Sequence, residues 1–222
     1  MFLDYCPVCR LPGLPNKLCP SCSCQAVTER FDTFMVRCPA CFHPLVSELY
    51  VCPECSMKIY SVFDYSASFV RRIVVRWKLE AERKLSPLVS GMFYDTLTEL
   101  GLTPDKYCLT KVPSSRKGKR NRGWDHMSDV LLFLKCKYNY TISDILITNK
   151  DSPVQQKNLN RVQRFEVARS RFKLKAKYTL PTLPLVILDD ITTTGASLHA
   201  CKSILEENNL EVWGAVTLLQ EL

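Results

Sequence analysis

The hydrophobic and polar positions along this chain change their pattern near residue 60. Beyond that point apolar side chains recur every three to four residues, typical of helices, or form short runs typical of buried strands. Helices are expected over residues 69–77, 85–100, 127–134 and 198–205. Strands are expected over residues 62–65, 107–112, 144–148, 185–188 and 212–219. This alternation predicts an α/β fold, a parallel sheet flanked by helices on both faces.

Cysteine, rather than hydrophobic periodicity, organises the first 55 residues. They contain four Cys-Pro-x-Cys knuckles: Cys6 with Cys9, Cys19 with Cys22, Cys38 with Cys41, and Cys52 with Cys55. Two thiolates on one turn can share a metal ion, and two knuckles complete the four-sulfur shell that structural Zn²⁺ prefers. Gaps of nine and ten residues predict two zinc sites from sequential pairs, with cross-brace pairing or an iron–sulfur cluster as alternatives. We therefore expect a double zinc-ribbon region with four-cysteine sites over residues 1–60 and a second domain over residues 61–222.

The other cysteines and the charge give weaker indications. Cys24 is expected to be a bystander thiol, and Cys108, Cys136 and Cys201 fall in apolar-periodic stretches that predict core positions. Paired thiols suggest a reducing compartment, and the chain shows no signal peptide and no apolar run that could span a membrane. We therefore expect a cytoplasmic protein with no membrane insertion. Its net charge of +8 favours an anionic partner. The cysteine-rich region could be a stabilising cap or a docking module.

The candidate chemistry lies at the end of the predicted strand 185–188. Asp189 and Asp190 follow it, and then a Thr-, Gly- and Ser-rich loop leads into a predicted helix. Free backbone N–H groups and the helix dipole make such a loop an anion site. Two carboxylates beside it suit a ligand that also offers sugar hydroxyls or a divalent cation, so a sugar phosphate is favoured. Without the loop that follows, the strand and its two aspartates would fit a Walker B strand or a phospho-acceptor aspartate equally well.

Two basic stretches also follow predicted strands, over residues 112–124 and 155–172. Open α/β sheets bind ligands at the carboxyl ends of their strands. Both stretches are therefore candidates for an anion site, although a solvated charge run or a nucleic-acid patch would have the same composition.

The run from Leu185 to Ser197 resembles the motif of type I phosphoribosyltransferases that binds 5-phosphoribosyl 1-pyrophosphate (PRPP). The resemblance implies that Asp189 and Asp190 bind the ribose hydroxyls. It also implies a loop around the 5′-phosphate made of Thr192, Thr193, Thr194, Gly195, Ala196 and Ser197.

The order of all the motifs, from cysteine knuckles through Val-Pro and basic residues to Gln-x-x-Leu-x-Arg-x-x-Arg and Asp-Asp-x-x-Thr-Thr-Gly, resembles the ComF family. These late-competence proteins are phosphoribosyltransferase-like and linked to DNA uptake and natural transformation. The resemblance implies a type I phosphoribosyltransferase fold and a flexible catalytic hood containing Arg161 and Arg164. It further implies a pyrophosphate loop made of Val112, Pro113, Ser114 and Ser115.

The implied activity is displacement of pyrophosphate from PRPP, with Mg²⁺ bridging the pyrophosphate, by an acceptor that the sequence does not identify. The alternative is a non-catalytic protein that senses PRPP or binds single-stranded DNA or DNA-uptake and recombination proteins. One departure from the family pattern is Arg122-Gly123-Trp124-Asp125-His126, where Asp125 and His126 replace Asn and Gln. We expect His126 to be an exposed helix residue.

Overall fold

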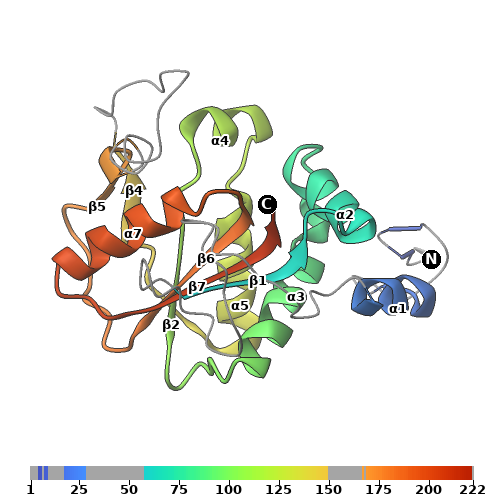
Figure 1. Ribbon diagram of the computed structural model, residues 1–222, viewed down its shortest axis with the longest axis horizontal. Coiled ribbons are helices and arrows are strands. Elements are labelled where there is room, and N and C mark those ends of the chain that lie inside the picture. The colour runs from blue at the N-terminus through green and yellow to red at the C-terminus, as the bar shows by residue number, and fades with distance from the viewer. Residues whose placement is uncertain are drawn as a thin grey trace.

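The computed structural model of the 222-residue chain describes residues 5, 6, 8, 9, 18–28, 58–149, 167 and 169–221. Its centre is a five-stranded parallel sheet in the order β1-β7-β6-β2-β3 (Figure 1). The strands are β1 (Ile59–Asp64), β2 (Cys108–Lys111), β3 (Thr141–Ile142), β6 (Leu185–Thr192) and β7 (Val212–Gln220). Because all five run the same way, their carboxyl ends meet at one edge of the sheet.

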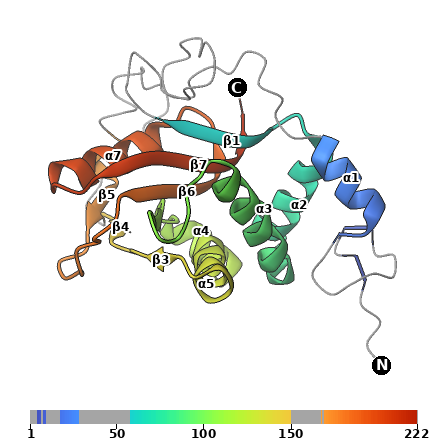
Figure 2. The same cartoon turned by 90° about the horizontal axis from the view of Figure 1, so that it is seen from below.

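Helices cover both faces of this sheet, as the sequence pattern predicts. One face carries α2 (Ser68–Lys78), α3 (Ser86–Glu99) and α5 (His126–Tyr138), which are grouped on one side in Figure 2. The other carries α7 (Ala196–Glu207), which packs on β6 and β7. The α/β architecture and the parallel sheet are thus confirmed.

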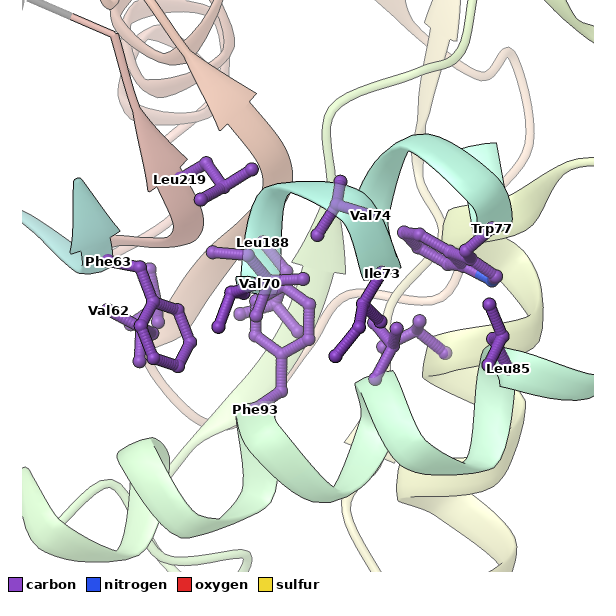
Figure 3. Packing of buried hydrophobic residues seen from close by; sticks show 14 of the residues in the cluster. Val62, Phe63, Val70, Ile73, Val74, Trp77, Leu85, Phe93, Leu188 and Leu219 are labelled. Atoms are coloured by element: carbon purple, nitrogen blue, oxygen red, sulfur yellow. The ribbon is translucent and has the colours of Figure 1, made fainter. Parts of the chain in front are cut away.

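The core between α2, α3 and the sheet explains the helical spacing in the sequence. The buried residues of α2 are Phe69, Val70, Ile73, Val74 and Trp77. They form one apolar stripe that faces Phe93 of α3 and the sheet residues Leu188 and Leu219 (Figure 3). Burying one such large side chain contributes about 1.5–3 kcal/mol, so this stripe fixes α2 against the sheet.

Other element boundaries differ from the prediction. A 3₁₀ helix (Arg83–Leu85) precedes α3. Gly101, which lies just beyond the end of α3, has a positive φ of 69°. The basic stretch that follows β2 contains a short helix, α4 (Arg116–Arg122), which the sequence pattern did not predict. The Ser115 hydroxyl caps it by accepting a hydrogen bond from the N–H of Gly118, at 3.0 Å. Gly123 ends it in the left-handed region with φ 75°.

The predicted strand over residues 144–148 is outside the parallel sheet. It forms β4 (Leu146–Thr148), which pairs antiparallel with β5 (Phe172–Leu174) in a separate two-stranded sheet. β3 already occupies the place beside β2, so the chain turns away from the main sheet before β4 begins.

The described part of the N-terminal region contains a helix. The second cysteine knuckle leads into a helix, α1 (Pro20–Thr28), with Pro20 at its first position, where proline costs no hydrogen bond. Figure 1 shows α1 beside α2, at the opposite end of the molecule from α7. The sheet starts at Ile59, so β1 includes the last two residues of the region predicted as cysteine-rich.

Two of the three cysteines predicted to be core residues are buried. Cys108 and Cys201 are inaccessible, whereas Cys136 is exposed on α5, so that prediction was wrong. Cys136 lies between Lys135 and Lys137 on the solvent side of the helix, where apolar spacing alone is a poor guide. Among the described residues, no helix is long and apolar enough to cross a membrane.

Candidate functional site at the carboxyl edge of the sheet

Three of the predicted site segments meet at the carboxyl edge of the sheet. The pairing of β2 with β6 sets Lys111 opposite Leu188, so residues 112–115 begin beside Asp189 and Asp190. The N–H of Val112 donates to the carbonyl oxygen of Leu188 at 3.1 Å, which joins the two segments directly. The turn over residues 193–195 leaves the same end of β6.

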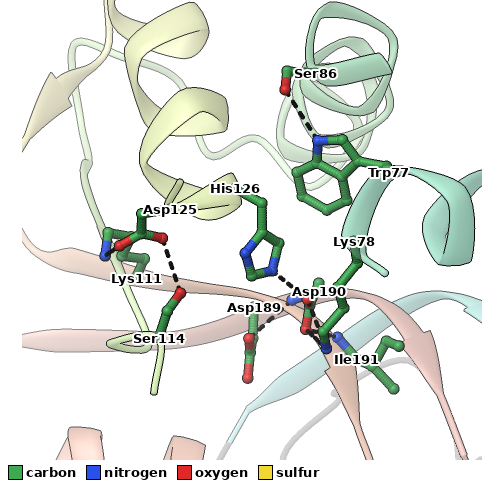
Figure 4. A network of polar contacts seen from close by, with 10 residues as sticks. All are labelled: Trp77, Lys78, Ser86, Lys111, Ser114, Asp125, His126, Asp189, Asp190 and Ile191. Atoms are coloured by element: carbon green, nitrogen blue, oxygen red, sulfur yellow. Dashed lines mark hydrogen bonds and ion pairs between the residues drawn. The ribbon is translucent and has the colours of Figure 1, made fainter. Parts of the chain in front are cut away.

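Asp190 is the most heavily bonded side chain of this site, and its side chain is only 4% exposed. Its Oδ1 accepts from Nζ of Lys78 at 2.9 Å and from the N–H of Ile191 at 2.7 Å. Its Oδ2 lies 2.8 Å from the same Nζ and 2.5 Å from Nε2 of His126 (Figure 4). Burial alone would raise the pKa of this carboxyl, but the His126 hydrogen bond and the Lys78 ammonium outweigh it and lower the pKa. Asp190 is therefore held as an anion.

Asp189 has the opposite environment. Successive residues of a strand point to opposite faces, and Asp189 follows Ile187 towards the α7 face, whereas Asp190 follows Leu188 towards α2 and α5. Its Oδ1 accepts from the N–H of Asp190 at 3.0 Å. The side chain is half-buried, and burial together with the charge of Asp190 raises its pKa well above the usual value. The two neighbouring acids thus have pKa shifts of opposite sign.

The predicted phosphate loop divides into a strand end, a turn and a helix start. Thr192 is buried and belongs to β6, and its carbonyl oxygen accepts from the N–H of Glu221. Thr193, Thr194 and Gly195 form the turn, and α7 starts at Ala196. Gly195 is the N-cap with φ 65°, and having no side chain it cannot cap the helix itself. Backbone N–H groups at the start of α7 therefore give this turn the donors and the dipole of an anion site.

The loop after β2 is tied to a second charged cluster. Ser114 donates from its hydroxyl to Oδ1 of Asp125 at 2.9 Å, and Nζ of Lys111 lies 3.0 Å from Oδ2 (Figure 4). Lys119 of α4 contacts the same carboxylate at 2.6 Å. Burial opposes ionisation of Asp125, but Lys111, Lys119 and the Ser114 hydroxyl lower its pKa well below the usual value. Lys111 itself is only 3% exposed, so a cation is buried at the end of β2.

His126 is buried, which corrects the expectation of an exposed helix residue. Its side chain is 5% exposed and lies edge-on to Trp77, with ring centroids 4.8 Å apart, and to Trp124, with centroids 6.2 Å apart. Trp77 is fixed in turn because its Nε1 donates to Oγ of Ser86 at 3.0 Å. Among the described residues, Nδ1 of His126 and Nε1 of Trp124 are buried without a hydrogen-bond partner.

Sequence reasoning missed Lys78, Lys111, Asp125 and His126 as site residues. Asp125 and His126 belong to the segment 122–126, which departs from the family pattern, and Lys111 ends a predicted strand, where a lysine could have marked a site. Nothing in the spacing of α2 distinguishes Lys78 from the other cations of that helix. The predicted hood residues Arg161 and Arg164 lie outside the described residues.

A candidate metal centre lies at the N-terminus. The sulfur atoms of Cys6, Cys9, Cys19 and Cys22 all lie within 4.8 Å of one another, and those of Cys9 and Cys19 are 3.6 Å apart. A tetrahedral zinc–thiolate site has sulfur atoms about 3.8 Å apart, so the four residues fit such a metal ion. Their proximity agrees with sequential pairing of the first two knuckles. Cys24 is exposed and outside the cluster. The second predicted site, Cys38, Cys41, Cys52 and Cys55, lies outside the described residues.

The thiols of this cluster are not equivalent. Burial raises the pKa of Cys6, but hydrogen bonds from backbone N–H groups, chiefly that of Cys19, outweigh it and lower the pKa to about 6. Burial, and hydrogen bonds that the Cys22 thiol donates to neighbouring cysteine sulfurs, raise the pKa of Cys22. Cys6, Cys19 and Cys22 pack into the same core as α2, and Nη1 of Arg76 donates to the carbonyl oxygen of Val8 at 3.4 Å. The cluster is thus attached to the helix that carries Lys78.

Comparison with known proteins adds no relative: no protein-family model matches the chain, and no curated protein matches it.

Proposed function

We propose that the carboxyl edge of the sheet binds PRPP together with Mg²⁺, and that the chain is a phosphoribosyltransferase-like protein of the ComF kind. One observation carries the proposal: the acid pair, the start of α7 and the loop over residues 112–115 lie at one edge of the sheet. The hydrogen bond between Val112 and Leu188 ties the second loop to the acid pair. A phosphorylated sugar that also carries pyrophosphate has a chemical group for each of these three segments: hydroxyls, a phosphate and a pyrophosphate.

Each segment has a chemistry suited to its proposed role. Backbone N–H groups of residues 195–197 and the dipole of α7 would hold the 5′-phosphate. The ribose would lie at the acid pair, where Asp189 is the half-buried member. Residues 112–115 would hold the pyrophosphate, and Lys111 and Lys119 lie close enough to add positive charge there.

Bound together with PRPP, Mg²⁺ would supply positive charge that offsets the charge of the leaving pyrophosphate. Asp189 is the half-exposed acid of the pair, and it suits an outward-facing contact with the ribose or the ion. Arg161 and Arg164 would stabilise the departing charge. The four-cysteine cluster would hold Zn²⁺ in a structural role, because all four positions of its shell are protein sulfur.

Calorimetric titration with PRPP, with and without Mg²⁺, tests the proposal. We expect binding that is strengthened by Mg²⁺ and weakened at least tenfold in Asp189→Asn. Asp105→Asn is the matched control, because this exposed acid precedes β2 at the opposite edge of the sheet. No binding to the wild-type protein, or equal loss in both variants, would refute the proposal. Pyrophosphate release with candidate acceptors then separates turnover from sensing.

A second candidate function rests on α4, which exposes Arg116, Lys119 and Arg120 and contains no acid. Such a helix can hold the phosphates of single-stranded DNA, in line with a role in DNA uptake. Binding of a fluorescent oligothymidine should then weaken steeply with salt, and Arg116→Ala with Arg120→Ala should flatten the salt dependence by about one to two units of slope. Unchanged affinity and slope would remove this candidate.

A further inference from the structure

Asp190 has little capacity left to bind a ligand. An ionised carboxylate offers about four lone-pair positions. Asp190 already accepts from Lys78 at both oxygens, from the N–H of Ile191 at Oδ1 and from His126 at Oδ2. A ribose hydroxyl could bond directly to this carboxylate only by displacing one of these donors.

The same contacts place one proton of His126. Because Asp190 is an acceptor only, the short contact to its Oδ2 requires a proton on Nε2 of His126. In the neutral imidazole the proton on Nε2 leaves Nδ1 as a lone-pair acceptor. Trp77 lies edge-on to the ring and holds its orientation.

In that tautomer Nδ1 is an acceptor, and the described part of the chain gives it no hydrogen-bond partner. Figure 4 shows that this atom lies on the side of the ring nearer Ser114 and Asp125, away from Lys78. Nε1 of the neighbouring Trp124 is a buried donor that likewise has no partner among the described residues. A hydroxyl can donate to Nδ1 and accept from an indole N–H, whereas a carboxylate cannot donate and an ammonium cannot accept.

We propose that His126, rather than Asp190 itself, contacts a hydroxyl of the bound sugar phosphate, by accepting its hydrogen bond at Nδ1. Asp190 is then a positioning residue, which acts through the imidazole, and Lys78 keeps it charged. This assignment rests on the proposed binding of PRPP and adds a ligand contact at a position where the family pattern has a different residue.

Nitrogen-15 NMR of the histidine rings tests the contact in the wild-type protein. The chain has three histidines, and His126→Gln assigns the signals of His126. We expect Nδ1 of His126 to show the shift of an unprotonated nitrogen in the free protein. Addition of PRPP with Mg²⁺ should move this signal towards that of a hydrogen-bonded nitrogen. A protonated Nδ1, or a signal that PRPP leaves unchanged, would overturn the proposal in favour of an ordered water or a purely structural ring.

Two variants give a second measurement. His126→Phe keeps a ring of similar size without nitrogen and should weaken PRPP binding about tenfold to a hundredfold. His126→Gln can donate to Asp190 and still offer an oxygen acceptor, so it should recover most of that loss. Met127→Leu is the control, because Met127 is the next residue of α5, is buried, and tolerates a volume-conserving change.

The outcomes separate this inference from the function on which it rests. Wild-type binding that His126→Phe leaves intact would overturn the role of His126 while the PRPP site stands. An equal loss in Met127→Leu would also overturn it, because the effect would then belong to α5 as a whole. Absence of PRPP binding to the wild-type protein would overturn both.

Discussion

Nζ of Lys78, at the last position of α2, lies 2.8 Å from Oδ2 of Asp190 near the carboxyl end of β6. The two residues are 112 positions apart, and α2 reaches the sheet edge only because its apolar stripe is buried against β6 and β7. The ion pair therefore joins the packing of one helix to the charge of the candidate site. It also makes α2 the link between the site and the cysteine cluster on its other side.

Removing the cation should cost stability. Lys78→Met leaves Asp190 buried with His126 and Ile191 as its remaining donors, and we expect a loss of about 2 kcal/mol in the free energy of unfolding. This is less than for a fully isolated buried charge, because Lys78 is 25% exposed and His126 still binds the carboxylate.

Urea unfolding of Lys78→Met, Asp190→Asn and the double variant measures the coupling. The double variant should lose less than the sum of the single losses, because each single change already breaks the same contact. Additive losses would mean that the pair contributes nothing to the folded state.

The opposite pKa shifts of Asp189 and Asp190 predict opposite dependences of stability on pH. The pKa of Asp190 in the folded protein is lowered. Its ionised side chain therefore stabilises the fold above about pH 4, the usual pKa in the unfolded chain, and this stabilisation is lost as the pH falls through the folded-state pKa. Asp190→Asn should therefore destabilise the protein at pH 7 by at least about 1 kcal/mol, and less near pH 3.

For Asp189 the sign is reversed. The pKa of Asp189 in the folded protein is raised, so as the pH rises the unfolded chain loses the Asp189 proton at a lower pH than the folded protein does. Asp189 therefore destabilises the folded protein increasingly as the pH rises above about 4. Asp189→Asn should stabilise the protein at pH 7, with the gain vanishing near pH 3. Unfolding of both variants across pH 3–8 tests the pair, and two curves of the same sign would contradict these assignments.

Local patterns predicted much of this fold because each depends on nearby residues. The apolar stripe of α2 and the run 185–188 are periodic signals, and the structure turns both into buried faces. The strand with which a given strand pairs depends on distant parts of the chain. The sequence predicts a strand over residues 144–148, but it pairs with β5 because β3 occupies the place beside β2.

The same distinction holds for the site. Asp189, Asp190 and the turn after them stand together in the sequence, so their proximity could be predicted. His126 and Lys78 reach Asp190 from two helices that are distant in the sequence. His126 was therefore expected to be exposed, because one turn of helix does not show which neighbour covers it. Cys136 was placed in the core for the same reason.

Metal binding should depend on the four clustered cysteines. Cys19→Ser removes one thiolate from the shell, and we expect it to lower the zinc content by about one ion per chain and to reduce the melting temperature. The second effect follows because Cys19 shares a core with α2. Elemental analysis and thermal unfolding measure both quantities. Cys24→Ser is the control, since Cys24 is exposed and outside the cluster, and an equal effect there would contradict the ligand assignment.

The cysteines of the α/β region should differ in their reaction with iodoacetamide in the native protein. Cys136 is exposed and should be alkylated fastest of the three, because iodoacetamide can reach its sulfur. Cys108 and Cys201 should be protected, since both are inaccessible. Burial also raises the pKa of Cys108 to about 11 and raises the pKa of Cys201 well above its usual value. Mass spectrometry of peptides after timed alkylation gives each rate, and Cys136→Ser should remove the fast reaction while leaving the slow two unchanged. Fast alkylation of Cys201 would show that α7 does not stay packed on β6. It would then also contradict the proposed phosphate site at the start of α7, beside Gly195.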